Sequence, residues 1–257
     1  MHLGRRKLRL AAAGVAAAAL IAAGCSSSGP GSTGASSGAK VTGGTATIAL
    51  PAGITYSWIF PFYAITNAGV YNDNQFQWLM YRPLYMFGNN TPTNVDINYP
   101  LSPADPPTYS NGGKTVTITM KGWKWSDGST VDAKSLIFFV NMTQAEKAIW
   151  YAYAKGLLPD NIVSYKATGP DTLTLQLNQP YSSLWYTYNQ LSELNPMPLA
   201  WDVTALGAKP GSGGCSTDTA ADDWAKCKAV YSFLTAQSKA ASSYATSPLW
   251  SVVDGPW

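Results

Sequence analysis

The clearest pattern of hydrophobic and polar positions in the chain is a strict alternation. Over residues 114–120 polar and apolar side chains follow each other in period two, which is typical of a strand with one face buried. The Asn-Gly-Gly sequence at 111–113 favours a hairpin-type turn just before it. A second hairpin is predicted over 162–168 and 172–177, because a Gly-Pro-Asp turn separates these two runs.

A helix with a well-defined start is predicted soon after the first of these strands. Asp132 is a good N-cap residue for a helix that begins at the next position. Val131 and Leu136 occupy the two positions of a hydrophobic staple, which fixes the angle at which the chain enters the helix. Leu136, Phe139 and Val140 then recur at helical spacing, so we expect one face of this helix to be buried.

Two tryptophans lead into the turn that precedes this helix. Trp123 and Trp125 are followed by a Ser-Asp-Gly turn that contains Asp127. We interpret these three residues as structural, since they connect a strand, a turn and a capped helix within a few positions.

The remaining pattern predicts shorter elements and long connections. Strands separated by helices, with the strands in antiparallel pairs, indicate a mixed α and β fold. The further elements expected are strands at 45–50 and 84–87, an aromatic loop at 52–64, helices at 72–80 (capped by Asn72 or Asp73), 181–191 and after a cap at Asp222 or Asp223, a loop-like segment at 89–113, and a surface insertion at 205–223.

The N-terminal 25 residues read as an export signal. A basic head precedes an apolar run of 15 residues over 10–24, which is shorter than the ~20 residues of a membrane-spanning helix. Small residues directly precede Cys25, as in a bacterial lipobox, although Ala22 stands where Leu is commoner. A lipoprotein signal peptide and an ordinary one with a chance cysteine both fit, as do the general and the twin-arginine export routes.

The next segment has the composition of a flexible tether. Residues 26–44 are rich in Ser and Gly and show no apolar period. Acyl chains on Cys25 would hold the protein at the cell membrane. We therefore expect an extracytoplasmic protein that is anchored to the membrane as a lipoprotein, with its folded part standing off the surface on the tether.

Charge and histidine content narrow the function. Four of the 17 basic residues lie in the signal segment and all 14 acidic residues follow it, so the mature chain is close to neutral and has no basic patch for nucleic acid. The only histidine, His2, lies in the signal segment. This excludes histidine as general base or metal ligand in the mature chain. We expect no cofactor, and a catalytic pair of carboxylates or a Ser-Lys pair stays formally open.

The two remaining cysteines are candidates for a disulfide. Cys215 and Cys227 enclose eleven residues, and cysteines outside the cytoplasm usually pair. The alternative is a pair of buried free thiols. Zinc is not expected with so few soft ligands.

The order of the motifs resembles family 5 of the solute-binding proteins of ATP-binding-cassette importers, which includes dipeptide-, oligopeptide- and nickel-binding lipoproteins. The alternating strand, the Trp-Ser-Asp-Gly turn at 125–128 and the helix start at 130–133 carry the likeness, with Thr130 where Pro is usual. Segments 77–85, 169–181 and 253–257 are similar to further family motifs.

The resemblance implies a periplasmic-binding-protein-like type II lobe of mixed α/β structure over residues 45–257. Family members are much longer, so it also implies that this is the N-terminal lobe and that the second lobe lies outside the sequence. The implied function is binding of a peptide or similar small solute, without chemistry, for delivery to a membrane permease. The ligand-contact residues that it implies are Tyr56, Ser57, Trp58, Tyr85, Asp254 and Trp257.

Two other classes of function remain open from the residues. A cell-wall-directed hydrolase would need two carboxylates that face one another across a pocket. A lipoprotein that only binds partner proteins would display a large exposed aromatic patch.

Overall fold

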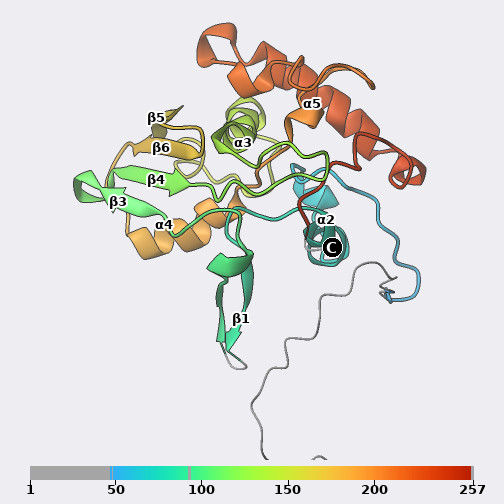
Figure 1. The fold of residues 1–257 in the computed structure, drawn as a ribbon, viewed down its shortest axis with the longest axis horizontal. Coiled ribbons are helices and arrows are strands. Elements are labelled where there is room, and N and C mark those ends of the chain that lie inside the picture. Colours follow the sequence, from blue (N-terminus) through green and yellow to red (C-terminus); the bar gives the residue numbers. More distant parts are fainter. Residues whose placement is uncertain (1–46, 48, 92–93, 256–257) are drawn as a thin grey trace, which may run out of the picture. The chain divides into compact units, whose positions relative to one another are not determined.

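The main sheet of the structure, a computed structural model that describes residues 47, 49–91 and 94–255, is four-stranded and antiparallel (Figure 1). Its strand order is β3-β4-β6-β5. These four strands span Thr108–Ser110 (β3), Thr115–Thr119 (β4), Thr172–Leu177 (β6) and Ile162–Ala167 (β5).

The two central strands, β4 and β6, each have one buried and one more polar face, as the alternation predicts. In the register of the sheet, Tyr109, Val116, Leu175 and Tyr165 form one row across the four strands. Val116 and Leu175 in the middle of this row are fully buried. The neighbouring row on the other face is polar, and it consists of Thr108, Thr117, Thr174 and Lys166.

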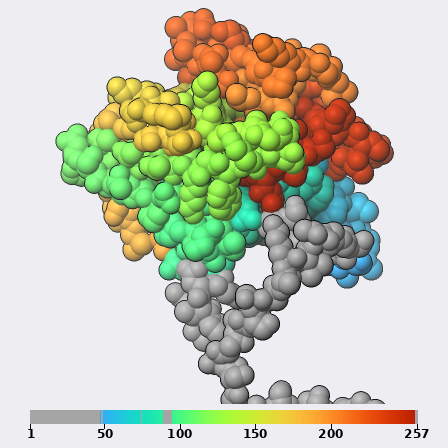
Figure 2. All heavy atoms as spheres, viewed as in Figure 1, coloured from blue at the N-terminus to red at the C-terminus, as the bar shows by residue number. Residues whose placement is uncertain are grey.

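Two helices contact the two ends of the buried row. The hydroxyl of Tyr109 is 2.8 Å from that of Thr187, which belongs to α4 (Ser183–Asn189). The hydroxyl of Tyr165 donates to the Oδ1 atom of Asn141, on α3 (Ala133–Glu146). The long helices α3 and α5 (Ala225–Ser238) also pack against each other. In Figure 2 the surface of the chain that follows α4, orange to red, lies beside that of β5 and β6, yellow.

The predicted start of α3 is confirmed. Asp132 is the N-cap, and its Oδ1 atom accepts hydrogen bonds from the backbone N–H groups of Lys134 (2.9 Å) and Ser135 (3.0 Å). Ser135 completes a capping box by accepting the N–H of Asp132. Val131 and Leu136, the predicted staple pair, are both fully buried.

The turn that follows Trp125 makes structural contacts, as predicted for Asp127. Asp127 accepts the backbone N–H of Ser129 at 2.9 Å, and the intervening glycine has a φ of 86°, which favours glycine. The backbone N–H of Ser126 donates to the carbonyl of Val253 (2.8 Å), and the Ser126 hydroxyl donates to the carbonyl of Ser251 (2.7 Å). The turn therefore holds the segment near residue 252 in place.

Several predicted elements are wrong in extent or kind. The helix expected at 72–80 is a π-helical turn, Asp73–Gln77, followed by the single turn α2, Trp78–Met80. Asn72 makes no capping bond, because its side chain accepts the N–H of Ser57 instead. The strand expected at 84–87 is also wrong, since Leu84 donates its N–H to the loop carbonyl of Leu194 (2.7 Å) and β1 starts only at Phe87.

The segment expected to be loop-like contains a hairpin and part of the sheet. β1 (Phe87–Thr91) pairs with β2 (Asn94–Ile97), and β3 pairs with β4. The first hairpin is rich in polar residues, so no apolar alternation signals it. Thr47, Ala49 and Leu50, which are the described residues of the strand expected at 45–50, have no regular structure.

The start of α5 also differs from the prediction. Its N-cap position is Trp224, with a left-handed φ of 55° and no capping side chain. Asp222 ends the preceding helical turn, Ala220–Asp222, and Asp223 pairs with Lys228 at 2.8 Å. The remaining short helical turns are Ile65–Asn67, Tyr99–Leu101, Asn111–Gly113, Leu191–Glu193, Leu199–Trp201, Cys215–Thr217 and Ala241–Ser243.

Candidate functional site

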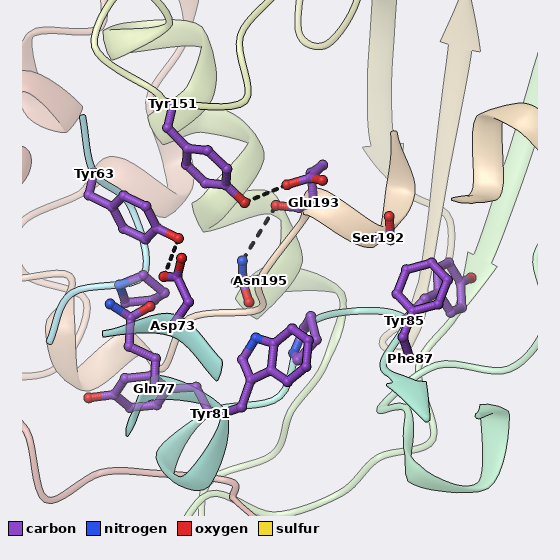
Figure 3. Close-up of a pocket in the computed structure, with 13 residues that line it drawn as sticks. Tyr63, Asp73, Gln77, Tyr81, Tyr85, Phe87, Tyr151, Ser192, Glu193 and Asn195 are labelled. Atoms are coloured by element: carbon purple, nitrogen blue, oxygen red, sulfur yellow. Dashed lines mark hydrogen bonds between the residues drawn. The ribbon is translucent and has the colours of Figure 1, made fainter. Parts of the chain in front are cut away.

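A pocket of about 250 Å³ opens where the aromatic loop, the Asp73–Gln77 turn and the segment around residue 193 meet (Figure 3). Aromatic and polar side chains make up most of its wall. The lining residues are Pro61, Tyr63, Asp73, Gln77, Trp78, Tyr81, Pro83, Tyr85, Phe87, Tyr151, Ser192, Glu193 and Asn195.

Two stacked tyrosines, each bonded to a carboxylate, organise one side of this pocket. The rings of Tyr63 and Tyr151 are parallel within 6°, with centroids 4.7 Å apart. The Tyr63 hydroxyl donates to Asp73, and the Tyr151 hydroxyl donates to Glu193 at 2.6 Å. In Figure 3 both hydroxyl groups and both carboxyl groups lie around the same space.

Backbone contacts bring these residues together from distant parts of the sequence. Tyr63 comes from the aromatic loop, whereas Tyr151 follows α3, and the N–H of Tyr151 donates to the carbonyl of Tyr63 at 2.9 Å. Asp73 begins the π-helical turn and Glu193 ends a short helical turn after α4. Asn195 donates to the Glu193 carbonyl at 3.4 Å.

Burial changes the acid–base properties of the pocket. It raises the pKa of the Asp73 carboxyl above its ordinary value, although the hydrogen bond from Tyr63 opposes this change. Burial also raises the pKa of Tyr151, and the negative charges of Glu193 and Asp73 add to the effect. Both tyrosines are therefore neutral hydrogen-bond donors at neutral pH, facing acidic groups.

The residues expected from the resemblance to contact ligand are not all in one place. Tyr85 lines this pocket, but it is fully buried and its hydroxyl donates to the carbonyl of Asp105 at 3.1 Å. Tyr56 stacks on Phe76, with ring centroids 4.2 Å apart, in the wall of a different pocket of about 340 Å³. Of the six expected residues, Tyr85 alone is among those lining the Asp73–Glu193 pocket.

The other expected residues have contacts of their own. Ser57 is exposed and donates its N–H to Asn72 at 3.0 Å. Trp58 is buried, and its indole N–H donates to the carbonyl of Phe60 at 2.7 Å. Trp257 and the lipidation candidate Cys25 lie outside the described residues, as do the signal segment and the tether. The roles of all these residues stay predictions.

Asp254 is enclosed by the protein next to Arg82. Its Oδ1 atom accepts the N–H of Arg82 at 3.1 Å, and its backbone carbonyl accepts the Arg82 Nε–H at 3.2 Å. The Oδ2 atom is buried without a hydrogen-bond partner. Burial is the largest cause that raises the Asp254 pKa to about 7, and Arg82 opposes it.

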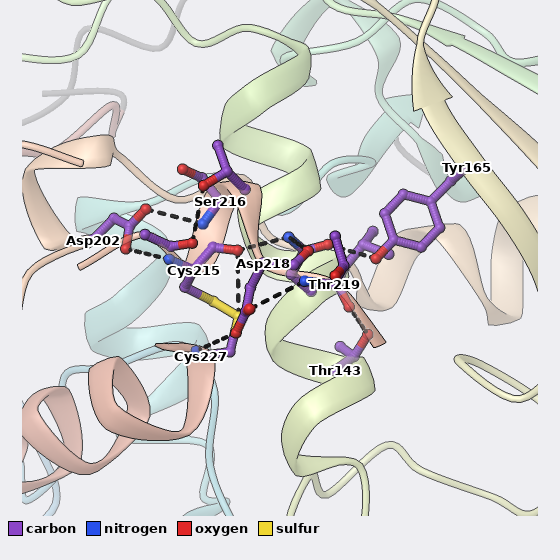
Figure 4. Close-up of a disulfide and its surroundings, with 12 residues drawn as sticks. Thr143, Tyr165, Asp202, Cys215, Ser216, Asp218, Thr219 and Cys227 are labelled. Carbon is purple, nitrogen blue, oxygen red and sulfur yellow. Dashed lines mark hydrogen bonds between the residues drawn. A yellow bond between two sulfur atoms is a disulfide. The ribbon is translucent and has the colours of Figure 1, made fainter. Parts of the chain in front are cut away.

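The predicted disulfide between Cys215 and Cys227 is present (Figure 4). Both half-cystines are fully buried. Asp202 accepts the N–H of Cys215 at 2.8 Å, and Asp218 accepts that of Cys227 at 2.9 Å. Asn141 of α3 donates to the Cys215 carbonyl at 2.6 Å. The disulfide therefore ties the predicted insertion to α5, and the Asn141 hydrogen bond ties it to α3.

Part of the Asp73–Glu193 pocket has a signal in the sequence. Tyr63 belongs to the predicted aromatic loop, and the sequence pattern suggests for Asp73 only the role of a helix cap. Tyr151 and Glu193 carry no local motif, and only the fold brings them close. Among the described residues no cluster of three or more His, Cys, Asp or Glu side chains has the arrangement of a metal site, and no described helix is long and apolar enough to span a membrane.

Comparisons with solved structures give partial matches. The chain is 17% identical to AppA, the oligopeptide-binding protein of Bacillus subtilis solved with a nonapeptide (TM-score 0.38), and 17% identical to NikZ of Campylobacter jejuni solved with Ni(L-His) (0.37). Each match covers 55% of this chain and 25% of the other. CtaP, an ABC transporter substrate-binding protein of Listeria monocytogenes, is 20% identical over 56% of this chain and 26% of its own, with a TM-score of 0.42.

The chain thus spans about a quarter of the length of these proteins. None of the curated protein sequences matches it. The family model for the middle part of the bacterial extracellular solute-binding proteins, family 5, matches residues 100–231, just over half of the chain. This match covers the sheet, α3, the disulfide and the first half of α5. The chain therefore belongs to family 5 of the bacterial extracellular solute-binding proteins.

Proposed function

We propose that this chain is part of the substrate-binding component of an ABC importer and binds a peptide or a similar small solute outside the cytoplasm. The observation that carries the proposal is the family match over residues 100–231. The solute is bound and released unchanged, and a permease in the membrane is the partner that receives it. A lipid anchor on Cys25 holds the protein at the membrane, and residues 26–44 act as its tether.

The Asp73–Glu193 pocket supports this proposal. Small-molecule sites are concave and mostly apolar, with a few polar groups that orient the ligand. Tyr63, Trp78 and Tyr151 provide aromatic surface, while Asp73 and Glu193 provide polar groups at fixed positions. The pocket belongs to one lobe of a two-lobed binding protein, whose lobes close on the solute by hinge motion.

Native mass spectrometry of the full chain with a mixture of short peptides tests this function. We expect saturable binding of a subset of the peptides, and recovery of each bound peptide with its mass unchanged. Separate titrations with sugars and with nickel salts show whether the chain binds either of these instead of peptides, and so define the class of solute. The proposal fails if no solute of any of these classes is retained.

A second candidate is hydrolysis of cell-wall glycans, because the pocket contains two acids and the pKa of Asp73 is raised by burial. Glycosidases use such a pair, with one acid protonated. Here, however, each carboxylate accepts a tyrosine hydroxyl, so a tyrosine already occupies one of its acceptor positions. Incubation with peptidoglycan fragments decides the case: we expect no cleavage, and cleavage that Glu193→Gln abolishes would establish the hydrolase.

A further inference from the structure

The Asp73–Glu193 pocket carries negative charge that no cation of the lining compensates. Among the 13 described residues that line it, two are acidic and none is Lys or Arg. The ion pairs in the described part of the chain involve Asp160, Asp222 and Asp223, so neither pocket carboxylate takes part in one. The described lining of the pocket therefore contains two carboxylates and no cationic side chain that pairs with them.

The nearest arginine in the sequence is directed elsewhere. Arg82 lies between two lining residues, Tyr81 and Pro83. Its guanidinium donates to the carbonyl of Leu101 at 2.7 Å and to that of Asp254 at 3.2 Å. These bonds direct the Arg82 guanidinium to Leu101 and Asp254, and Arg82 is not among the residues that line the pocket.

The tyrosine pair adds a second feature that suits a cation. Tyr63 is 4% exposed and Tyr151 is 36% exposed, so the stack reaches from the core to the surface. Cations are attracted to the faces of aromatic rings, and more strongly where water is excluded. The two hydroxyls also hold Asp73 and Glu193 in fixed positions, so the carboxylates are oriented before a ligand arrives.

We propose that this pocket binds a positively charged nitrogen group of the solute, a primary ammonium or a guanidinium. The inference rests on the proposed solute-binding function and narrows it to cationic solutes. Asp73 and Glu193 accept its N–H groups, and Tyr151 lies beside its charge. A neutral alkyl group of the same length has no N–H donors for these oxygens and leaves the carboxylates without a counter-charge.

A matched pair of probes isolates the charge: N-acetyl-lysinamide and N-acetyl-norleucinamide, which share a backbone and an alkyl chain and differ in the terminal group. N-acetyl-argininamide tests the guanidinium. Titration of the full chain by ligand-observed NMR or calorimetry gives the affinities. We expect the better of the two cationic probes to bind at least about tenfold more tightly than the neutral one, as charge-assisted hydrogen bonds require.

Two variants place this preference in the pocket. Glu193→Gln and Asp73→Asn keep an oxygen that accepts the tyrosine hydroxyl and remove one negative charge. Each is expected to lower the affinity for the cationic probe about tenfold and to change that for the neutral probe less than twofold. The control is Asp105→Asn, which makes the same change at an exposed position outside the pocket and should leave both affinities unchanged.

The results separate this inference from the proposed function. Equal affinity for the three probes, no binding of any of them, or a preference that survives both pocket variants overturns the cation site. If the peptide mixture still binds in any of these cases, solute binding stands and only its charge preference is lost. If one variant fails to fold, two results still test the cation site. They are the affinities of the three probes for the unchanged chain and the affinities measured with the other variant.

Discussion

Replacing the buried carboxyl of Asp254 with an amide is expected to stabilise the protein in a pH-dependent way. Asp254 is 7% exposed, its Oδ1 atom accepts the N–H of Arg82, and its Oδ2 atom has no partner. Asn at this position keeps an oxygen for the Arg82 N–H. It also removes the cost of burying a negative charge.

The magnitude follows from the pKa of Asp254. Burial raises it from the ordinary 3.8 to about 7. Between these values the folded protein holds a proton that the unfolded chain has released, so the free energy of unfolding falls as the pH rises through this window. Since a tenfold change in proton affinity corresponds to about 1.4 kcal/mol, the full loss above pH 7 is about 4 kcal/mol.

Urea unfolding at pH 4 and pH 8, followed by tryptophan fluorescence, measures this effect. We expect Asp254→Asn to be close to the wild type in stability at pH 4 and more stable by about 2–4 kcal/mol at pH 8. Other titrating groups cancel in the difference between variant and wild type. The matched control, Asp105→Asn at an exposed position, should stay within about 0.5 kcal/mol at both pH values.

The reasoning is refuted if the difference between Asp254→Asn and the wild type does not change with pH. If the variant is less stable than the wild type at pH 8 but not at pH 4, the stability difference has the opposite sign to the one expected. This result would mean that Arg82 stabilises the Asp254 charge more than burial penalises it.

Three further changes test the scaffold, each by urea unfolding at pH 7. Asp132→Ala removes the cap of α3 and should cost about 1–2 kcal/mol; a loss below about 0.3 kcal/mol would contradict the capping role. The double replacement of Cys215 and Cys227 by Ala opens an eleven-residue loop and should cost about 3 kcal/mol; unchanged stability would mean that the loop is held by its hydrogen bonds alone. Phe139→Ala empties a fully buried site and should cost about 3–5 kcal/mol, whereas Leu184→Ala, at a side chain that is 67% exposed, should cost less than about 0.5 kcal/mol.

The local parts of the fold were predictable because local physics decides them. The alternation over 114–120 reports a strand with one buried face, and β4 has that form. The capped start of α3 depends on Asp132 and its next three residues, and the sequence contains all of them. The disulfide was predictable because the chain has two cysteines besides Cys25, and cysteines usually pair outside the cytoplasm, where the N-terminal pattern predicts the protein to be.

Other elements depend on partners that the sequence does not reveal. The N–H of Leu84 bonds to a loop more than a hundred residues away, so its apolar neighbours do not make a strand. Asn72 looks like a helix cap, yet its side chain bonds to Ser57. Glu193 and Tyr151 meet only because the fold places the turn after α4 beside the segment that follows α3. Local pattern cannot supply such long-range contacts, and the candidate pocket is made of them.

The measurement that tests the central claim most directly is equilibrium binding of a peptide mixture to the full chain, with mass analysis of what is recovered. The account predicts that selected peptides bind saturably, that cationic ones are preferred, and that all are released intact. Retention of no solute at all, or recovery of cleaved products, would contradict it.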